Sequence, residues 1–536
     1  MIKGLLLILF SVSFLTCSLD SNKEAKKSIF HYNQPNPITS LDPAFAKTQN
    51  NYWACEHLYN QLLDLDDSLH IVPELAKYYT ISEEGKLYTF ILRNDVYFTG
   101  NKCFKDSLSR VVNASDVAFS FYRLLDTKLS APGRWIFVDK IDSINGFKAL
   151  NDTVFQLRLK RPFAPLLSLL TMHYCSIIPE EAIDYYKDKF RENPVGTGPF
   201  VLTNWVDRQG MFFRKNTNYF KNGKPHLDGI RISFIEDRNT AYLEFMKKRI
   251  DYFSGIHSSF APQLINRFGM LRDDRVGMMN FMRGTYLNTE YIGINVNAVS
   301  TNHALRNKYI RQALNLAINK ELMVQTFKYG IGKAANSGFI PPGLTSFDSV
   351  RFKGYSYDPD SARALLKLAG YSNLKKDEQQ LVLYTNKDFI DLITFVARQW
   401  QEVGIDVKIE LLETATLREK MRAAELPIFR ASWIADYPDE ESFLTVFYGP
   451  NSSPPNYTRF QNQQFDLFYE DAMKETDPEL RKDLYQKMNK IIIDEAPVVF
   501  LLYDEVALFS QNNIHGIIPN AINLLKLEDV KKLIIE

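Results

Sequence analysis

The chain has few cysteines, almost no imbalance of charge and, beyond its first 17 residues, no hydrophobic run long enough to cross a bilayer. Its 64 basic and 63 acidic residues give a net charge of +1. No overall field therefore attracts phosphate backbones, and nucleic acid is not an expected partner. Four cysteines and eight histidines without Cys-x-x-Cys or His-Glu-x-x-His spacing give a metal site little support. No metal or other cofactor is expected.

The composition is that of an ordinary globular protein, with 45% apolar and 24% charged residues. At 536 residues the chain has the length of about three or four packing units. We find no internal repeat, low-complexity tract or long linker in residues 28–536. These features predict one body of several interwoven lobes.

The first 17 residues differ from the rest. Lys3 is followed by the apolar run Leu5–Phe10, and the stretch ends at Cys17. The run is too short to span a bilayer and is typical of a secretory signal. Its end resembles a bacterial lipobox, which predicts lipid attachment at Cys17, although Thr16 departs from the usual small residue. A plain signal peptide or a buried cysteine is the alternative.

Residues 18–27 are polar and charged without apolar periodicity, so we expect a flexible tether. Three cysteines remain beyond Cys17, namely Cys55, Cys103 and Cys175. In an oxidising compartment two of them can form a disulfide and leave one free. The sequence does not select the pair.

Local patterns predict alternating strands and helices. Residues 87–93 alternate as a half-buried strand does, and Asn113 with Asp116 forms a capping signal for a helix. Apolar residues from Ile393 to Trp400 form an amphipathic helix, which Gly404 ends before a strand over 405–411. A helix also runs through Ala54, Leu58 and Leu62, before a hairpin at residues 64–67. A helix followed by a strand marks an α/β unit.

The segment Pro194–Phe200 contains too much glycine and proline for a regular element and predicts a tight, shaped loop. No Gly-Lys-Ser/Thr sequence and no helix start follow it, so phosphate binding is not expected.

Several blocks in a fixed order resemble the bacterial solute-binding proteins of family 5, which serve ABC importers of oligopeptides, dipeptides and nickel. The likeness to the oligopeptide-binding members is greatest. The blocks are the lipobox-like start, Ser40-Leu41-Asp42-Pro43, residues 92–117, Val195-Gly196-Thr197-Gly198-Pro199-Phe200 with Trp205, Tyr291-Ile292-Gly293-Ile294-Asn295, Arg311-Gln312-Ala313-Leu314, Pro341-Pro342-Gly343, residues 364–371, Trp433-Ile434-Ala435-Asp436-Tyr437-Pro438 and Ala496-Pro497-Val498.

The resemblance implies an α/β protein with the type II periplasmic-binding fold, two lobes joined by a hinge and an extra inserted subdomain. We expect the division to be 1–17 signal peptide, 18–27 tether, 28–60, 177–287 and 503–536 lobe I, 61–176 inserted subdomain of lobe I, and 288–502 lobe II. The hinge strands are expected near residues 286–291 and 499–503.

The resemblance also implies a function. The chain would be an extracytoplasmic lipoprotein of the cell envelope, a monomer held to the membrane by its lipid alone, and not an enzyme. It would capture short peptides between the lobes and deliver them to the permease subunits of an ABC importer. In the oligopeptide-binding members, the residue matching Asp436 holds the ligand's amino group, and the one matching Arg430 can take the carboxylate of a tripeptide.

The chemistry of this segment agrees with that role. A short peptide offers an amine, a carboxylate and a row of backbone groups. Arg430 can bind a carboxylate with two parallel hydrogen bonds, and the backbone of Ser432, Trp433 and Ile434 can pair with an extended ligand. Six residues of strand cover about 20 Å and a tripeptide covers about 10 Å, so the segment must bend or Arg430 serves a longer ligand.

Alternatives remain open for each residue. Asp436 can be a turn or helix-entry residue before Pro438, Arg430 can form an ion pair within its own lobe, and Trp433 can be core. Other ligands, such as a nickel chelate, haem or a sugar, are also compatible with the family. A secreted hydrolase that uses Asp439 and Glu441 is the rival from another class, although no nucleophile elbow, catalytic triad or zincin motif is present.

Overall fold

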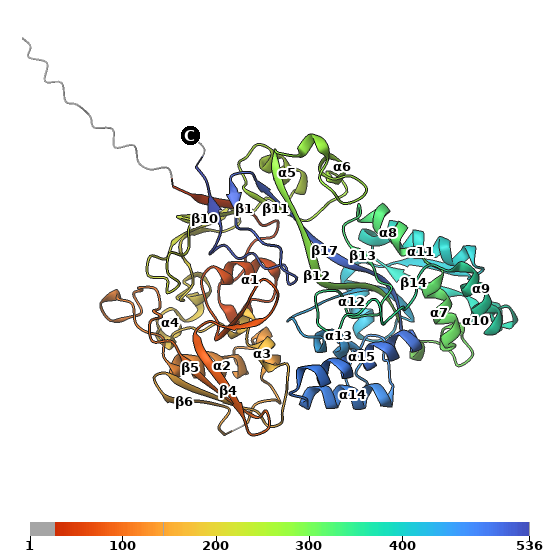
Figure 1. Cartoon of the computed structure of the whole chain (residues 1–536), viewed down its shortest axis with the longest axis horizontal. Coiled ribbons are helices and arrows are strands. Elements are labelled where there is room, and N and C mark those ends of the chain that lie inside the picture. Colours follow the sequence, from red (N-terminus) through yellow and green to blue (C-terminus); the bar gives the residue numbers. More distant parts are fainter. Residues whose placement is uncertain (1–26, 143, 535–536) are drawn as a thin grey trace, which may run out of the picture.

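The computed structural model describes residues 27–142 and 144–534. An 11-stranded sheet runs through the whole molecule, with long central strands β12 and β17 (Figure 1). In spatial order its strands are β15 (Val407–Leu411), β14 (Leu381–Thr385), β16 (Ile428–Ile434), β12 (Met279–Ile294), β17 (Val498–Gln511), β11 (Tyr252–Ser254), β1 (Ile29–Asn33), β10 (Gly229–Ser233), β9 (Gly210–Lys215) and β8 (Phe200–Val206), with β13 (Lys333–Ala334) paired to β17.

Strands β12 and β17 connect the two halves of the molecule. They pair antiparallel, but the register is interrupted between Thr285 and Thr289 on β12, which face Glu505 and Tyr503 on β17. The paired stretch on one side of this break continues into β11 and β1, and the stretch on the other side continues into β16 and β14. The irregularity lies within or beside the segments where the sequence predicts the hinge.

Alternation of side chains on these strands builds two cores. Tyr291 and Phe500 point into one apolar cluster, whereas Ile292 and Val499 point into another. Neighbouring residues of a strand face opposite sides of the sheet, so this part of the sheet is buried on both faces. Helices cover it, among them α7 (Lys308–Leu316), α8 (Lys320–Phe327), α9 (Pro359–Leu368), α11 (Ile390–Glu402), α12 (Thr414–Arg422), α14 (Gln463–Lys474) and α15 (Pro478–Glu495).

The other half contains a second, four-stranded sheet. Its order is β4 (Ala76–Ser82), β5 (Leu87–Leu92), β7 (Val154–Arg158) and β6 (Phe147–Asn151). Helix α2 (Ala114–Leu125) packs on it, with Phe121 against Phe155 at a centroid distance of 5.6 Å. The largest core extends from this sheet to β1 and to the C-terminal segment, since Phe30 and Val530 belong to it.

The remaining described elements are short or lie at the edges. They are α1 (Gln49–Glu56), α3 (Leu166–Leu169), α4 (Glu180–Tyr186), α5 (Arg238–Met246), α6 (Ala261–Leu264), α10 (Lys376–Gln379), α13 (Glu441–Leu444), β2 (Leu63–Leu65), β3 (Ile71–Pro73), β18 (Ile514–His515) and β19 (Lys531–Lys532). No helix among the residues described is both long and apolar enough for a membrane span.

The glycine-rich loop fits tightly against the end of α1. A β-carbon on Gly198 would lie 2.4 Å from the carbonyl carbon of Leu58, and one on Gly196 would lie 2.1 Å from the oxygen of Leu58. The Gly198 N–H donates to that oxygen at 2.9 Å. This bond corrects the expectation of a helix through residues 54–62, because α1 ends at Glu56 and Leu58 is used by the loop instead.

Other local expectations are confirmed. Asn113 and Asp116 form a complete capping box at the start of α2, and β2 and β3 form the hairpin predicted at residues 64–67. Gly404 follows α11 with a φ of 92°, the left-handed region expected of a helix C-cap. The boundaries of the two lobes and the inserted subdomain given above stay a proposal.

Candidate functional site

A cavity of about 400 Å³ contains Asp436 and lies beside the central strands. One wall is the segment that follows β16, residues 434–438. The facing wall comes from residues 46–65 and 171–174, with Tyr286 on β12 and two residues near the C-terminus completing the lining. The cavity therefore joins segments on both sides of the register break, and its volume is in the range of small-ligand sites.

Asp436 is the unpaired acid of this cavity. Its backbone N–H donates to the hydroxyl of Ser442 at 3.3 Å, which fixes the turn after β16. Within residues 27–142 and 144–534, no side chain forms an ion pair or hydrogen bond with its carboxylate. Solvent reaches the side chain, yet protein surrounds it on most sides. Loss of hydration, with the nearby charge of Glu441, raises the pKa of Asp436 to about 6.

Tyr174 approaches Asp436 from the facing wall. It lies in the short 3-10 helix His173–Cys175 and lines the same cavity. Burial, together with the negative charge of Asp436, raises the pKa of the Tyr174 phenol to about 12. The phenol is thus a neutral hydrogen-bonding group beside the acid at neutral pH.

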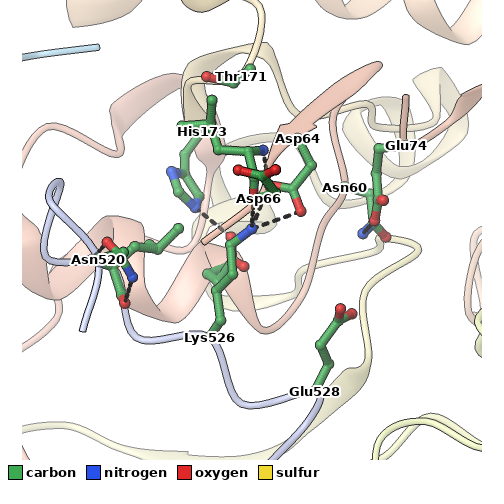
Figure 2. Close-up of polar contacts among 12 residues, drawn as sticks. Asn60, Asp64, Asp66, Glu74, Thr171, His173, Asn520, Lys526 and Glu528 are labelled. Carbon is green, nitrogen blue, oxygen red and sulfur yellow. Dashed lines mark hydrogen bonds and ion pairs between the residues drawn. The ribbon is translucent and has the colours of Figure 1, made fainter. Parts of the chain in front are cut away.

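Most charges of the facing wall are matched within the wall. The Lys526 ammonium lies 2.7 Å from each carboxylate oxygen of Asp64 (Figure 2). His173 Nε2 lies 2.9 Å from Glu56, and its ring stacks on Tyr52 at 5.7 Å. These groups form a polar surface with little net attraction for an ion.

Lys47 differs from these wall residues. It is exposed, lines the cavity and forms no ion pair with any residue in the described ranges. The cavity thus contains an unmatched acid on the segment after β16 and an unmatched base on the facing wall.

Beneath this wall, a buried polar cluster ties the glycine-rich loop to the cavity. Asn60 donates to Glu74 at 2.7 Å and accepts from the Thr197 hydroxyl at 2.8 Å. Lys221 lies between Glu74 and Glu528, at 2.9 Å and 3.2 Å. Figure 2 shows Asn60, Glu74 and Glu528 close to the Asp64–Lys526 pair. The shaped loop is therefore a support for the wall.

A second cavity, of about 740 Å³, meets the first at Asp436 and Tyr437, which line both. It lies between residues 135–163 and residues 433–474. Six of its nineteen lining residues are aromatic, namely Trp135, Phe163, Trp433, Tyr437, Tyr448 and Tyr469, and six others are charged.

The segment Ser432–Ile434 has one strand neighbour. On one side it pairs with β12, from Asn288 opposite Ile434 to Glu290 opposite Ser432. On the other side β14 pairs with β16 at Phe429 and not beyond. Among the residues described, the free side of 432–434 thus has no backbone partner, which is the geometry that an extended peptide can join.

The structure places the other expected site residues as follows. Ile434 is 48% exposed and lines the first cavity. Trp433 lines the second, and its indole N–H donates to the backbone oxygen of Ser442 at 2.5 Å. Ser432 lines neither of these cavities with its side chain, so its expected part is that of its backbone.

Arg430 lies apart from both cavities. Its guanidinium forms an ion pair with Glu290 on β12 and lies over the ring of Phe389, 3.1 Å from the centroid. Both ionic side chains are largely buried, at 12% and 13% exposure. This geometry agrees with the alternative in which Arg430 forms an ion pair within its own half of the molecule. Contact of Arg430 with a ligand's carboxylate stays a prediction.

Asp439 and Glu441, the two acids of the hydrolase alternative, contact other side chains of the protein. Asp439 is buried, accepts from the Tyr485 hydroxyl at 2.8 Å and lies 3.7 Å from Arg481. Glu441 accepts from the hydroxyls of Tyr437 and Tyr469. Asp439 lines neither cavity, so the two carboxylates do not face a common space.

Sequence reasoning missed the residues that come from distant segments. Lys47, His173, Tyr174 and Trp135 lie in loops or short helices without a motif, and their approach to Asp436 depends on the fold. Cys55, Cys103 and Cys175 are free thiols, so none of the possible disulfides forms among them. Cys17 and the expected signal peptide lie outside the described residues, as does the tether except for Lys27.

Comparison with known proteins shows which family this chain resembles. The family model "Bacterial extracellular solute-binding proteins, family 5 Middle" matches residues 70–455. Heme-binding protein A of Haemophilus influenzae is 28% identical over 493 residues, 89% of this chain and 87% of the relative. The dipeptide-binding protein of Escherichia coli is 27% identical over 493 residues, 88% of each chain.

A solved structure agrees with these matches. The periplasmic binding protein DppA from Helicobacter pylori, in complex with the peptide STSA, superposes with a TM-score of 0.75 at 25% identity, over 94% of this chain and 98% of that one. The expected type II periplasmic-binding fold is thereby confirmed. The relatives named here bind solutes and are not described as enzymes. With a family model that covers most of its length, this chain belongs to the bacterial extracellular solute-binding proteins of family 5.

Proposed function

We propose that this protein captures short peptides in the cavity that contains Asp436 and delivers them to the permease of an ABC importer. The observation that carries the proposal is the unmatched carboxylate of Asp436 in a ligand-sized cavity. An acid that has lost part of its hydration and has no charge partner is unfavourable in the free protein, and a ligand's ammonium group offsets that cost.

The neighbouring groups suit the rest of a peptide. The free side of Ser432–Ile434 supplies backbone donors and acceptors for an extended chain. Lys47 supplies a positive charge on the facing wall. A peptide with its amine at Asp436 and its carboxylate toward Lys47 contacts both walls, so binding favours closure of the cavity. Micromolar capture needs about 8 kcal/mol, which two charged anchors and several backbone hydrogen bonds can supply.

The relatives support a peptide as ligand, because one is named a dipeptide-binding protein and a similar structure contains a tetrapeptide. Haem is the alternative ligand, because another relative is named a heme-binding protein. We further propose that the protein acts without chemical catalysis, as a monomer at the cell envelope, held by a lipid on Cys17.

Calorimetry with Ala-Ala-Ala and its N-acetylated form tests the proposal. Asp436→Asn should weaken Ala-Ala-Ala binding by about tenfold or more, since it removes a charge-assisted contact worth about 1.5–3 kcal/mol. Acetylation should weaken binding to the wild type strongly and to Asp436→Asn little. Asp471→Asn, an exposed acid on α14 outside both cavities, is the matched control. Equal affinities for the free and acetylated peptides would refute the proposal.

A further inference from the structure

We infer that Arg283 and Glu505 form a lock beside the hinge, which stabilises the closed arrangement of the two halves and thereby raises ligand affinity from outside the cavity. Both residues lie next to the register break between β12 and β17, and neither lines either cavity described above. This inference rests on the proposed function, because the lock acts on closure around a ligand.

The turn that follows α8, residues 329–332, crosses the register break. It leads into β13, which pairs with β17 at Leu502 (Figure 1). This pairing fixes the end of the turn to the half that contains β16. Ile331, in contrast, is 3% exposed and belongs to the same apolar cluster as Leu264 and Phe509, in the half that contains β1. Residues 329–332 therefore form a strap between the two halves.

The Arg283 guanidinium binds backbone groups from both sides of the strap. Its Nη1 donates to the carbonyl of Gly269 at 3.1 Å, and its Nη2 donates to the carbonyl of Gly330 at 2.9 Å. Its Nε donates to the Glu505 carboxylate at 3.0 Å. The same carboxylate accepts from the backbone N–H of Gly332 at 3.2 Å. One ion pair thus joins β12, β17, the strap and the hairpin that contains Gly269.

This hairpin, residues 265–271, and the strap fit closely against each other. A β-carbon on Gly330 would lie 2.7 Å from the carbonyl carbon of Phe268, and one on Gly269 would lie 2.7 Å from the oxygen of Gly330. Rotation of one half against the other moves the strap relative to the hairpin, because the two are fixed to different halves. The contacts of the lock are therefore matched to one arrangement of the halves.

The arrangement that contains the lock is a closed one. The Ala164 N–H donates to the carbonyl of Met473 at 2.9 Å, and the rings of Trp135 and Tyr437 lie 6.1 Å apart. Both contacts cross the space between residues 135–163 and 433–474. Because the lock and these contacts are present together, interactions within the lock add to the stability of the closed form.

Calorimetry with Ala-Ala-Ala and its N-acetylated form tests the effect on affinity. Arg283→Gln should weaken Ala-Ala-Ala binding by about 3–10-fold, because a smaller share of the free protein is closed. The factor lost on acetylation should stay that of the wild type, since Asp436 is unchanged. Arg249→Gln is the matched control, because it removes an exposed ion pair with Glu244 in the same half, and it should bind as the wild type does.

Hydrogen exchange measures closure without any ligand. The Ala164 amide should be protected in the free wild type, because it bonds Met473 across the cleft. In Arg283→Gln it should exchange about 3–10-fold faster. The Phe155 amide, in the inner strand β7 of the four-stranded sheet, should exchange equally in both proteins, which shows that the variant is folded.

A second variant tests the lock without removing a charge. Gly330→Ala should speed exchange at Ala164 in the same way, because its methyl separates the strap from the hairpin. Gly223→Ala has nearly the same backbone φ, 74° against 75°, but its methyl meets no atom within 4 Å. It should leave exchange at Ala164 unchanged.

The two measurements distinguish failure of the lock from failure of the proposed function. If Ala-Ala-Ala binding depends on Asp436, but Arg283→Gln alters neither its affinity nor exchange at Ala164, the lock is refuted and the proposed function stands. If the wild type binds no peptide while Arg283→Gln speeds exchange at Ala164, the proposed function is refuted and the lock stands. An unprotected Ala164 amide in the free wild type would also refute the lock.

Discussion

Arg430 and Glu290 form an ion pair across strands β16 and β12, with both side chains largely buried and Phe389 beneath the guanidinium. The pair holds together two strands on one side of the register break. A buried arginine that already has a carboxylate partner gains little from a second one, and removing it leaves the partner's charge unmatched.

This geometry predicts that Lys47, and not Arg430, responds to the ligand's carboxylate. Lys47→Gln should weaken binding of Ala-Ala-Ala by about 3–10-fold and should leave binding of the C-terminally amidated peptide nearly unchanged, since only the former loses an ionic contact. Calorimetry with both peptides measures the difference.

Arg430→Gln is the comparison for this prediction. It should lower the thermal midpoint of unfolding, because Glu290 loses its partner. It should not weaken binding of Ala-Ala-Ala more than binding of the C-terminally amidated peptide. If Arg430→Gln selectively weakened binding of the peptide with the free carboxylate and Lys47→Gln did not, the result would instead support the role that the family resemblance implies for Arg430.

Peptide affinity should depend on pH through Asp436. Its pKa is raised to about 6, so the free protein takes up a proton there as the pH falls through that value. Only the ionised carboxylate attracts an ammonium group. Affinity should therefore be highest near pH 7 and fall by up to tenfold per unit below about pH 6. It should fall again above about pH 8, where the ligand's own amine loses its proton.

The variant Asp436→Asn separates this effect from the titration of other groups. Its affinity should be low at pH 7 and change little down to pH 5. A wild-type profile that is flat between pH 7 and 5 would contradict the assignment of Asp436 as the amine's partner.

Gly198→Ala should destabilise the protein. The added methyl would meet the backbone of Leu58 and Tyr59 within 2.7 Å, where no side chain can move aside. Overpacking of this kind costs about 1–3 kcal/mol. Urea unfolding monitored by tryptophan fluorescence measures the loss.

Gly223→Ala is the control for steric contact. Its φ is 74°, so an alanine is strained there, but the new methyl meets no atom within 4 Å. It should cost less than Gly198→Ala. Equal losses in the two variants would mean that the close approach to Leu58 is unimportant.

Much of the fold could be predicted because its signals are local. The capping box of Asn113 and Asp116 and the left-handed Gly404 depend on a few neighbouring residues. The end of α1 could not be predicted, because Leu58 is apolar at helical spacing and leaves the helix to bond Gly198, 140 positions later in the chain. A contact of this kind leaves no pattern in a single sequence.

In the candidate site, too, some residues could be predicted from local sequence patterns and others could not. Asp436 could be singled out from the motif around it, and its carboxylate does lie in a cavity. The surroundings of Arg430 could not be predicted from the sequence, because Glu290 and Phe389 contact it from other elements. Lys47 and Trp135 carry no local signal, since only the tertiary fold brings them to the two cavities.

The order of strands also bears on how the chain reaches its native state. β1, near the start, pairs with β10 and β11, and β11 in turn pairs with β17, near the end. Trp53 donates to the backbone of Asn523 at 2.8 Å, a contact between residues 470 positions apart. A chain that emerges with its N-terminus first cannot complete this sheet until β17 is available. The part of the large sheet that contains β1 thus stays incomplete until the last part of the chain has been synthesised.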